Sequence, residues 1–150
     1  MAERTFTDEQ LALLLQASRD FAFQQIAEGM PMLPFASCVD PDGDMNFVRF
    51  AEPGTDKTPE EVLSLTHDEV RAQADKGALL AAGIVSGVRL ARPEDGMEDA
   101  VRIEIEAPGF ARQFLAFYRF EPDADGKAAT VSPGKLVPFE AEAKIFADSA

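Results

Sequence analysis

Hydrophobic side chains near the start of the chain recur at the spacing of one helix face. The stripe consists of Leu11, Leu14, Leu15, Ser18, Phe21, Ala22 and Ile26. Thr7 suits an N-cap, and Gln10 stands three residues later, where it completes a capping box. Gly29 and Pro31 follow the last apolar position and favour termination. The pattern predicts an amphipathic helix over residues 8–28.

Two apolar runs follow, at residues 33–39 and 45–51, with the sequence Asp-Pro-Asp-Gly-Asp between them. Pro41 fixes its own φ, an aspartate side chain bonds back to the local backbone, and Gly43 accepts a left-handed conformation. Apolar runs on both sides of such a turn predict a β-hairpin.

A second helix begins after the hairpin. Thr58 is its predicted N-cap, Pro59 takes the first helical position, and Glu61 completes a capping box. Its buried side consists of Val62, Leu63, Thr66, Val70 and Ala74. Gly77 is expected to end it.

The next run, residues 78–92, is apolar or small on both faces until Arg89. This composition is typical of a central strand that is covered on both sides near its start. Gly83 and Gly87 share one face under a two-residue period. They leave a flat surface that either a helix of the same chain or another subunit can approach closely.

Two further strands are predicted by residues 101–106 and 110–120. Val101, Ile103 and Ile105 alternate with Arg102, Glu104 and Glu106, which indicates a half-exposed strand. Residues 110–120 are rich in aromatic side chains and apolar on both faces.

Apolar and polar residues alternate in the C-terminal part of the chain as well. Val137, Phe139, Ala141, Ala143 and Ile145 occupy every second position, beginning beside Pro138. This pattern predicts an edge strand over Val137–Ile145 that buries Phe139. The alternative is a helix, because Ala, Glu and Lys are good helix formers.

Together these elements predict one α+β domain over residues 1–150. A mainly antiparallel sheet of five to six strands is packed by two helices, in the order helix, hairpin, helix, three strands and the tail. No internal repeat or linker divides the chain.

Charge narrows the range of partners. The chain has 14 Lys and Arg against 27 Asp and Glu, for a formal net charge of −13. A field of this sign repels nucleic-acid phosphates and anionic lipid headgroups, so we expect neither a nucleic acid nor a membrane as partner. The negative charge either simply keeps the protein soluble or provides a docking face for a basic protein.

Cysteine content and the N-terminal sequence bear on the compartment. The single cysteine excludes an intramolecular disulfide and fits a reducing environment. The first residues have no basic segment followed by an apolar one, and no apolar run reaches membrane length. A cytoplasmic location is therefore expected.

Few residues suggest chemistry. The only histidine, His67, lies on the second helix beside Leu63 and Val70, with no carboxylate four residues away on its face. A partly buried structural role is favoured over a catalytic base. Cys38 has no basic neighbour that would lower its pKa, so an inert core thiol is favoured over a nucleophile.

Asp40, Asp42 and Asp44 raise the question of calcium. The EF-hand pattern requires Gly at position 45 and Glu at position 51, where this chain has Met45 and Ala51. We therefore interpret the aspartates as turn residues and expect no metal site. We also expect no cofactor and no catalytic residues, because phosphate-binding glycine loops and nucleophile motifs are missing.

One combination of segments stands out: the hairpin sequence PFASCVDPDGDMNFVRF, the helix capped by Thr58, the runs ALLAAGIVSGVRLAR and VRIEIE, and Pro138-Phe139 in the tail. It resembles a group of small uncharacterised bacterial proteins, for which no activity can be carried over. The order of elements is also similar to that of roadblock and other profilin-like domains. That likeness implies a non-catalytic, often dimeric scaffold, and it concerns topology alone.

The sequence thus favours a non-enzymatic binding, regulatory or scaffold module that acts through self-association or a protein partner, such as a basic protein. The competing hypothesis is an enzyme or small-molecule-binding protein. That alternative requires a cleft between the first helix and the sheet, lined by Phe and Met side chains such as Met30 and Met32.

Overall fold

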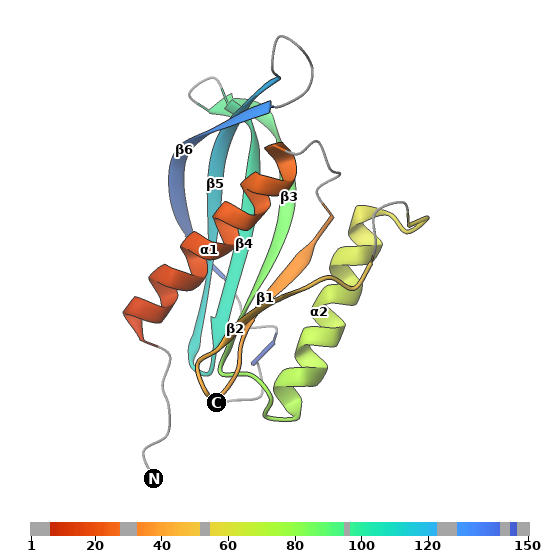
Figure 1. The fold of residues 1–150 in the computed structure, drawn as a ribbon, viewed down its shortest axis with the longest axis vertical. Helices are drawn as coiled ribbons and strands as arrows, with labels where there is room; N and C mark the ends of the chain where they lie inside the picture. The colour runs from red at the N-terminus through yellow and green to blue at the C-terminus, as the bar shows by residue number, and fades with distance from the viewer. Residues whose placement is uncertain are drawn as a thin grey trace.

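The computed structural model describes residues 7–27, 33–51, 55–94, 97–122, 129–141 and 145–146. Within them the elements are α1 (Asp8–Ala27), β1 (Phe35–Val39), β2 (Met45–Val48), α2 (Pro59–Asp75), β3 (Ala81–Glu94), β4 (Met97–Ala107), β5 (Phe110–Pro122) and β6 (Ala129–Glu140). The six strands form one antiparallel sheet in the order β2-β1-β3-β4-β5-β6. The predicted α+β class, a mainly antiparallel sheet packed by two helices, is confirmed (Figure 1).

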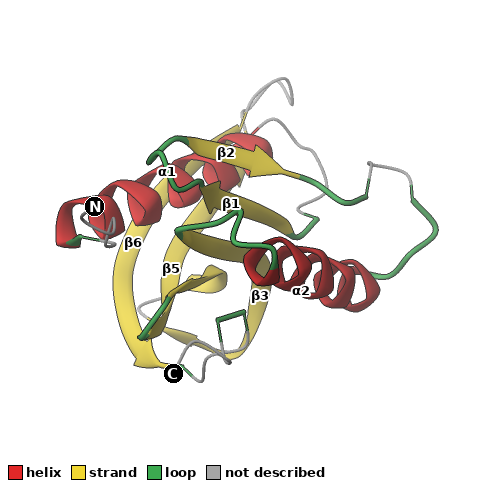
Figure 2. Ribbon diagram, turned by 90° about the horizontal axis from the view of Figure 1, so that it is seen from below, coloured by secondary structure: helices red, strands yellow, loops and turns green. Residues whose placement is uncertain are grey.

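The two helices cover different faces of the sheet (Figure 2). α1 crosses β3, β4, β5 and β6, while α2 packs on β1 and β3. Alternate residues of the central strands therefore enter two separate cores. Val85, Ile103 and Ile105 face α1, whereas Ala82 and Ile84 face α2.

Both helices begin as their sequences predict. The Thr7 N–H donates to Gln10 Oε1, and the Gln10 N–H donates to Thr7 Oγ1. Thr58 and Glu61 form the same reciprocal capping box, with Pro59 at the first helical position. α2 is followed by Gly77 at φ +74°. The expected stop of α1 at Gly29 and Pro31 lies outside the described residues.

The predicted hairpin is also confirmed. Asp40 Oδ1 accepts the backbone N–H groups of Asp42 and Asp44, each at 2.9 Å. Gly43 adopts φ +91°. The turn therefore keeps the Asp40 carboxylate in a fixed position, because one of its oxygens closes the loop.

Gly83 lets α1 approach the sheet closely. The Ser18 and Ser37 hydroxyl oxygens lie 2.8 Å apart beneath the helix, and Ser37 donates to the Gly83 carbonyl at 3.4 Å. A Cβ atom added at Gly83 would stand 2.5 Å from Ser37 Oγ. The sequence left open whether a helix of the same chain or another subunit approaches this face, and at Gly83 it is the chain's own helix α1. Gly87, by contrast, is exposed.

The polar side of β4 does not match its prediction as a half-exposed strand. Only 3% of Glu106 is exposed, and its Oε1 accepts the backbone N–H of Ile145 at 2.9 Å. Glu104 is largely covered as well. The reason is tertiary, since α2 and the segment containing Ile145 and Phe146 pack over this face.

The prediction for the tail is partly wrong. The strand is β6, which ends at Glu140 rather than reaching Ile145. Phe139 is 44% exposed instead of buried, because it lies on an edge strand beyond the area that α2 covers. Ile145 is buried as expected, although it lies in a bend rather than in a strand.

Candidate functional site

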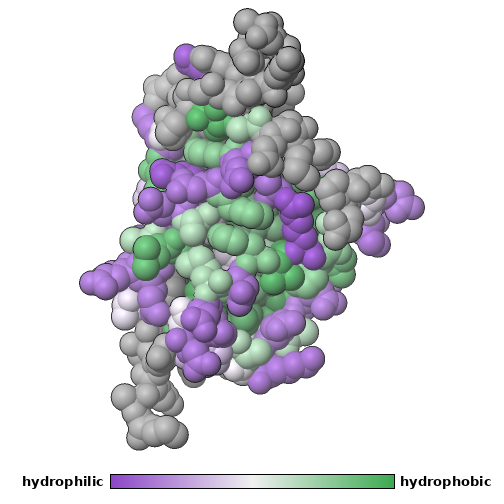
Figure 3. Space-filling view, in the orientation of Figure 1, coloured by the Kyte–Doolittle hydropathy of each residue, from purple (hydrophilic) through white to green (hydrophobic). Residues whose placement is uncertain are grey.

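An apolar surface lies on the α1 side of the molecule. We define it by Leu13 and Phe21 of α1 and Met45 and Phe47 of β2. Leu13 is 61% exposed and Phe47 is 38% exposed, while Phe21 and Met45 are partly buried against the core. Figure 3 shows hydrophobic side chains gathered at the centre of this face, with hydrophilic ones around them. Exposed hydrophobic groups bordered by polar residues are typical of interaction sites.

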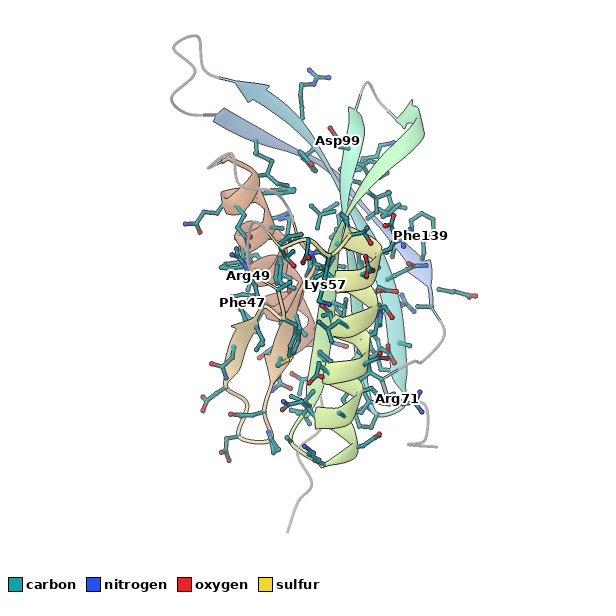
Figure 4. The ribbon with its side chains drawn as sticks, turned by 90° about the vertical axis from the view of Figure 1, so that its right-hand side faces the viewer. Phe47, Arg49, Lys57, Arg71, Asp99 and Phe139 are labelled. Carbon is teal, nitrogen blue, oxygen red and sulfur yellow. The ribbon has the colours of Figure 1, made fainter. Side chains whose placement is uncertain are left out.

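Aromatic packing fixes the part of this surface nearest the hairpin. Phe47 stacks on Phe21 with ring centroids 4.5 Å apart and planes 4° from parallel, and both rings contact Phe35 edge-on. The Arg49 guanidinium lies over the Phe21 ring and donates to Gln25 Oε1. In Figure 4, Phe47 and Arg49 lie together on this side, away from Phe139. The surface is therefore preformed rather than assembled on binding.

Carboxylates border the apolar surface on both of its elements. Glu9 and Asp20 share the side of α1 that carries Leu13, since they lie four residues before it and seven after it. Asp42 and Asp44 are exposed in the turn that leads into β2. Asp20 also pairs with Arg19 at 3.4 Å, a contact between exposed groups that contributes little energy.

A groove lies on the other side of α1, against β6. It has a volume of about 220 Å³ and is lined by Ala12, Leu15, Gln16, Arg19 and Leu136. This groove does lie between the first helix and the sheet, where the competing hypothesis requires a cleft. The described residues of its lining include no carboxylate or histidine that would act as a general acid or base. Met30 and Met32 lie outside the described residues.

The free edges of the sheet are poorly suited to adding another strand. β2 has only four residues. β6 has Pro133 and Pro138, which lack the N–H group that a strand ladder needs. These features disfavour partners that dock by extending the sheet.

A pocket lies on the opposite face, between the hairpin and α2. Its volume is about 220 Å³, and it is lined by Cys38, Asp40, Asn46, Val48, Phe50, Val70, Gln73, Ala78 and Leu79. Cys38 stands in this lining, and its burial raises the pKa of the thiol to about 11. The thiol is therefore neutral at physiological pH, as expected of an inert core cysteine.

The reactivity of Cys38 tests this environment. Because the pKa rises from 9.0 to about 11, the folded chain contains about 100-fold less thiolate near pH 8 than the unfolded chain. We expect alkylation by iodoacetamide to be slower by at least that factor in the folded protein than in denaturant. Equal rates would show that the fold neither shields the thiol nor raises its pKa.

His67 contacts a carboxylate on another element, Glu104 of β4, which the sequence of its own helix could not predict. Its Nδ1 donates to the Leu63 carbonyl at 3.0 Å, and its Nε2 lies 3.1 Å from Glu104 Oε2 on β4. The side chains are 21% and 13% exposed. Both ring nitrogens face acceptors, so the imidazolium form, in which both nitrogens donate, satisfies the pair. This contact joins α2 to the centre of the sheet.

Removing the imidazole should weaken the fold. We expect His67→Ala to lower the free energy of unfolding by about 1–2 kcal/mol, because it leaves the largely covered Glu104 carboxylate without this donor. Asp68→Ala, at the exposed neighbouring position, is the control and should change it by less than about 0.5 kcal/mol. Chemical denaturation measures both. Equal small effects would mean that the His67–Glu104 contact adds no stability.

The described ranges contain no group of three or more His, Cys, Asp or Glu side chains placed to hold a metal ion. Asp40, Asp42 and Asp44 serve the hairpin turn as interpreted from the sequence. Among the described helices, none combines the length and apolar character needed to cross a membrane.

No family model, no curated protein and no solved structure matches the chain.

Proposed function

We propose that the protein is a non-enzymatic binding module whose α1-side apolar surface docks a basic, amphipathic segment of a partner protein. The observation that supports this most strongly is that Leu13 of α1 and Phe47 of β2, both on the α1 side of the molecule, are exposed, while exposed carboxylates lie on or next to the same two elements. An apolar anchor on the partner would bury these side chains, and its lysines or arginines would face Glu9, Asp20, Asp42 and Asp44.

A second copy of the chain fits this surface less well. Each copy has a net charge of −13, so two copies repel one another. Of the two glycines that favoured self-association from the sequence, Gly83 is covered by α1 of the same chain, whereas Gly87 is exposed. Charge complementarity therefore supports a basic partner over a homodimer.

The test uses a fluorescent peptide of about 18 residues in which leucine and lysine form an amphipathic helix. A second peptide has glutamate in place of each lysine. Fluorescence anisotropy with the full chain should give micromolar binding for the lysine peptide, weakening as salt rises, and none for the glutamate peptide.

Two charge-neutral variants locate the site. Leu13→Gln should weaken binding about tenfold, since burying a leucine is worth about 1.5–3 kcal/mol. Phe139→Gln alters another exposed hydrophobic residue, which lies away from this surface, and should leave affinity within about twofold. Equal affinity of the wild type and Leu13→Gln would contradict the proposal. So would a dimer mass in light scattering that Leu13→Gln reduces to the monomer mass of 16.3 kDa.

A further inference from the structure

The pocket between the hairpin and α2 has two chemically distinct parts. Val48, Phe50, Val70 and Leu79 give it apolar walls. Asp40, Asn46 and Gln73 supply polar groups, which come from both the hairpin and the helix. An apolar body with a few polar groups is the usual composition of a small-molecule site.

The charge in this pocket has one sign. Of the described residues that line it, Asp40 is the charged one, and the Cys38 thiol in the same lining is neutral because burial raises its pKa to about 11. Among the described residues that line the pocket there is no lysine or arginine. The pocket therefore favours a cation and disfavours an anion.

The carboxylate is also held in place before any ligand arrives. Two backbone N–H groups of the turn, from Asp42 and Asp44, bind the same oxygen, Oδ1. This geometry fixes the side chain of Asp40 and leaves its Oδ2 outside the turn hydrogen bonds. A preorganised acceptor loses little freedom when it binds a donor.

Size sets a further limit. A volume of about 220 Å³ corresponds to roughly seven molecules of liquid water. This space suits a ligand of about ten non-hydrogen atoms rather than a nucleotide or a peptide.

We propose that this pocket binds a small primary amine that carries a short apolar or aromatic group. The ammonium group donates to the Asp40 carboxylate, and the apolar group lies against Val48, Val70 and Leu79. The site is separate from the docking surface of the proposed function, because it lies on the α2 face of the sheet. Its test is therefore independent of that proposal.

Three probes of nearly equal shape test the chemistry: phenethylamine, 2-phenylethanol and phenylacetate. Each is titrated into the isotope-labelled full chain, and backbone and side-chain amide shifts are followed by NMR. We expect saturable, millimolar binding of the amine, with shifts at Cys38, Asn46 and Gln73. The alcohol should bind at least about tenfold more weakly, and the carboxylate should show no saturable shift.

Asp40→Asn is the decisive variant, because the amide oxygen can still accept the two turn N–H groups while the charge is lost. We expect it to abolish the preference for the amine over the alcohol. Asp42→Asn removes the same charge from the same turn outside the pocket lining and should keep affinity within about twofold.

The proposal fails if the amine binds Asp40→Asn as tightly as it binds the wild type. It also fails if the alcohol matches the amine, or if the shifts appear outside the pocket. The absence of any saturable shift with the amine would overturn it as well. Should Asp40→Asn lose its folded spectrum, the ranking of the three probes on the wild-type chain decides the question.

Discussion

Replacing Phe35 by alanine should lower the free energy of unfolding by about 4 kcal/mol, close to the total stability of a weakly stable domain. Phe35 is fully buried at the junction of β1 and α1. Its ring packs edge-on against Phe21 at 4.9 Å and Phe47 at 6.0 Å between centroids. Truncation would leave a cavity and remove the support beneath the α1-side apolar surface.

Phe139→Ala is the matched control for this variant. The sequence alone predicts that Phe139 is buried and that its truncation costs about 3 kcal/mol or more. Because it is 44% exposed on the edge strand, we now expect a loss below about 1 kcal/mol. Urea denaturation of the two variants measures the difference. Similar losses would contradict the assignment of Phe35 to the core and Phe139 to the surface.

Gly83→Ala should cost about 2–3 kcal/mol, although alanine is the better residue in most strands. The new Cβ would lie 2.5 Å from Ser37 Oγ, in the contact that joins β1 to Ser18 of α1. Either the helix moves outward or the buried pair of hydroxyl groups separates. Both responses weaken the packing of α1 on the sheet.

The control for this change lies four residues further along the same strand. Gly87 is exposed, so Gly87→Ala should be neutral or stabilise the protein by a few tenths of a kcal/mol. Thermal unfolding of both variants checks the contrast. A stable Gly83→Ala protein would show that α1 does not approach the sheet as closely as described.

The sequence predicts well what short-range chemistry determines. The capping boxes at Thr7 and Thr58 and the Asp40 turn each depend on residues within four positions of one another. These local signals are sufficient to place both helix starts and the hairpin. The apolar runs then set the order of elements.

The sequence could not predict contacts that form only because one element covers a particular face of the sheet. Strand alternation assigned Arg102, Glu104 and Glu106 to one side of β4, and that side is correct. It could not show that α2 brings His67 to Glu104, or that Ile145 donates to Glu106. These partners are 37 and 39 residues away in the chain.

The candidate surfaces were beyond prediction for the same reason. Leu13 belonged to no predicted core stripe, and the local pattern gave no indication that Phe47 would stack on Phe21 of α1. The pocket joins hairpin residues such as Cys38 to Gln73 and Leu79 at the end of α2. No periodicity links these positions, because they meet only when the helix packs on the sheet.

The most direct test of the central claim maps where a basic amphipathic segment binds. The isotope-labelled full chain is titrated with the unlabelled leucine-lysine peptide, and backbone amide shifts are recorded by NMR. We expect the largest shifts at Leu13 and its neighbours on α1 and at Met45 and Phe47 of β2, while Pro59–Asp75 of α2 changes little. Shifts concentrated on α2, or none at saturating peptide, would contradict the central claim.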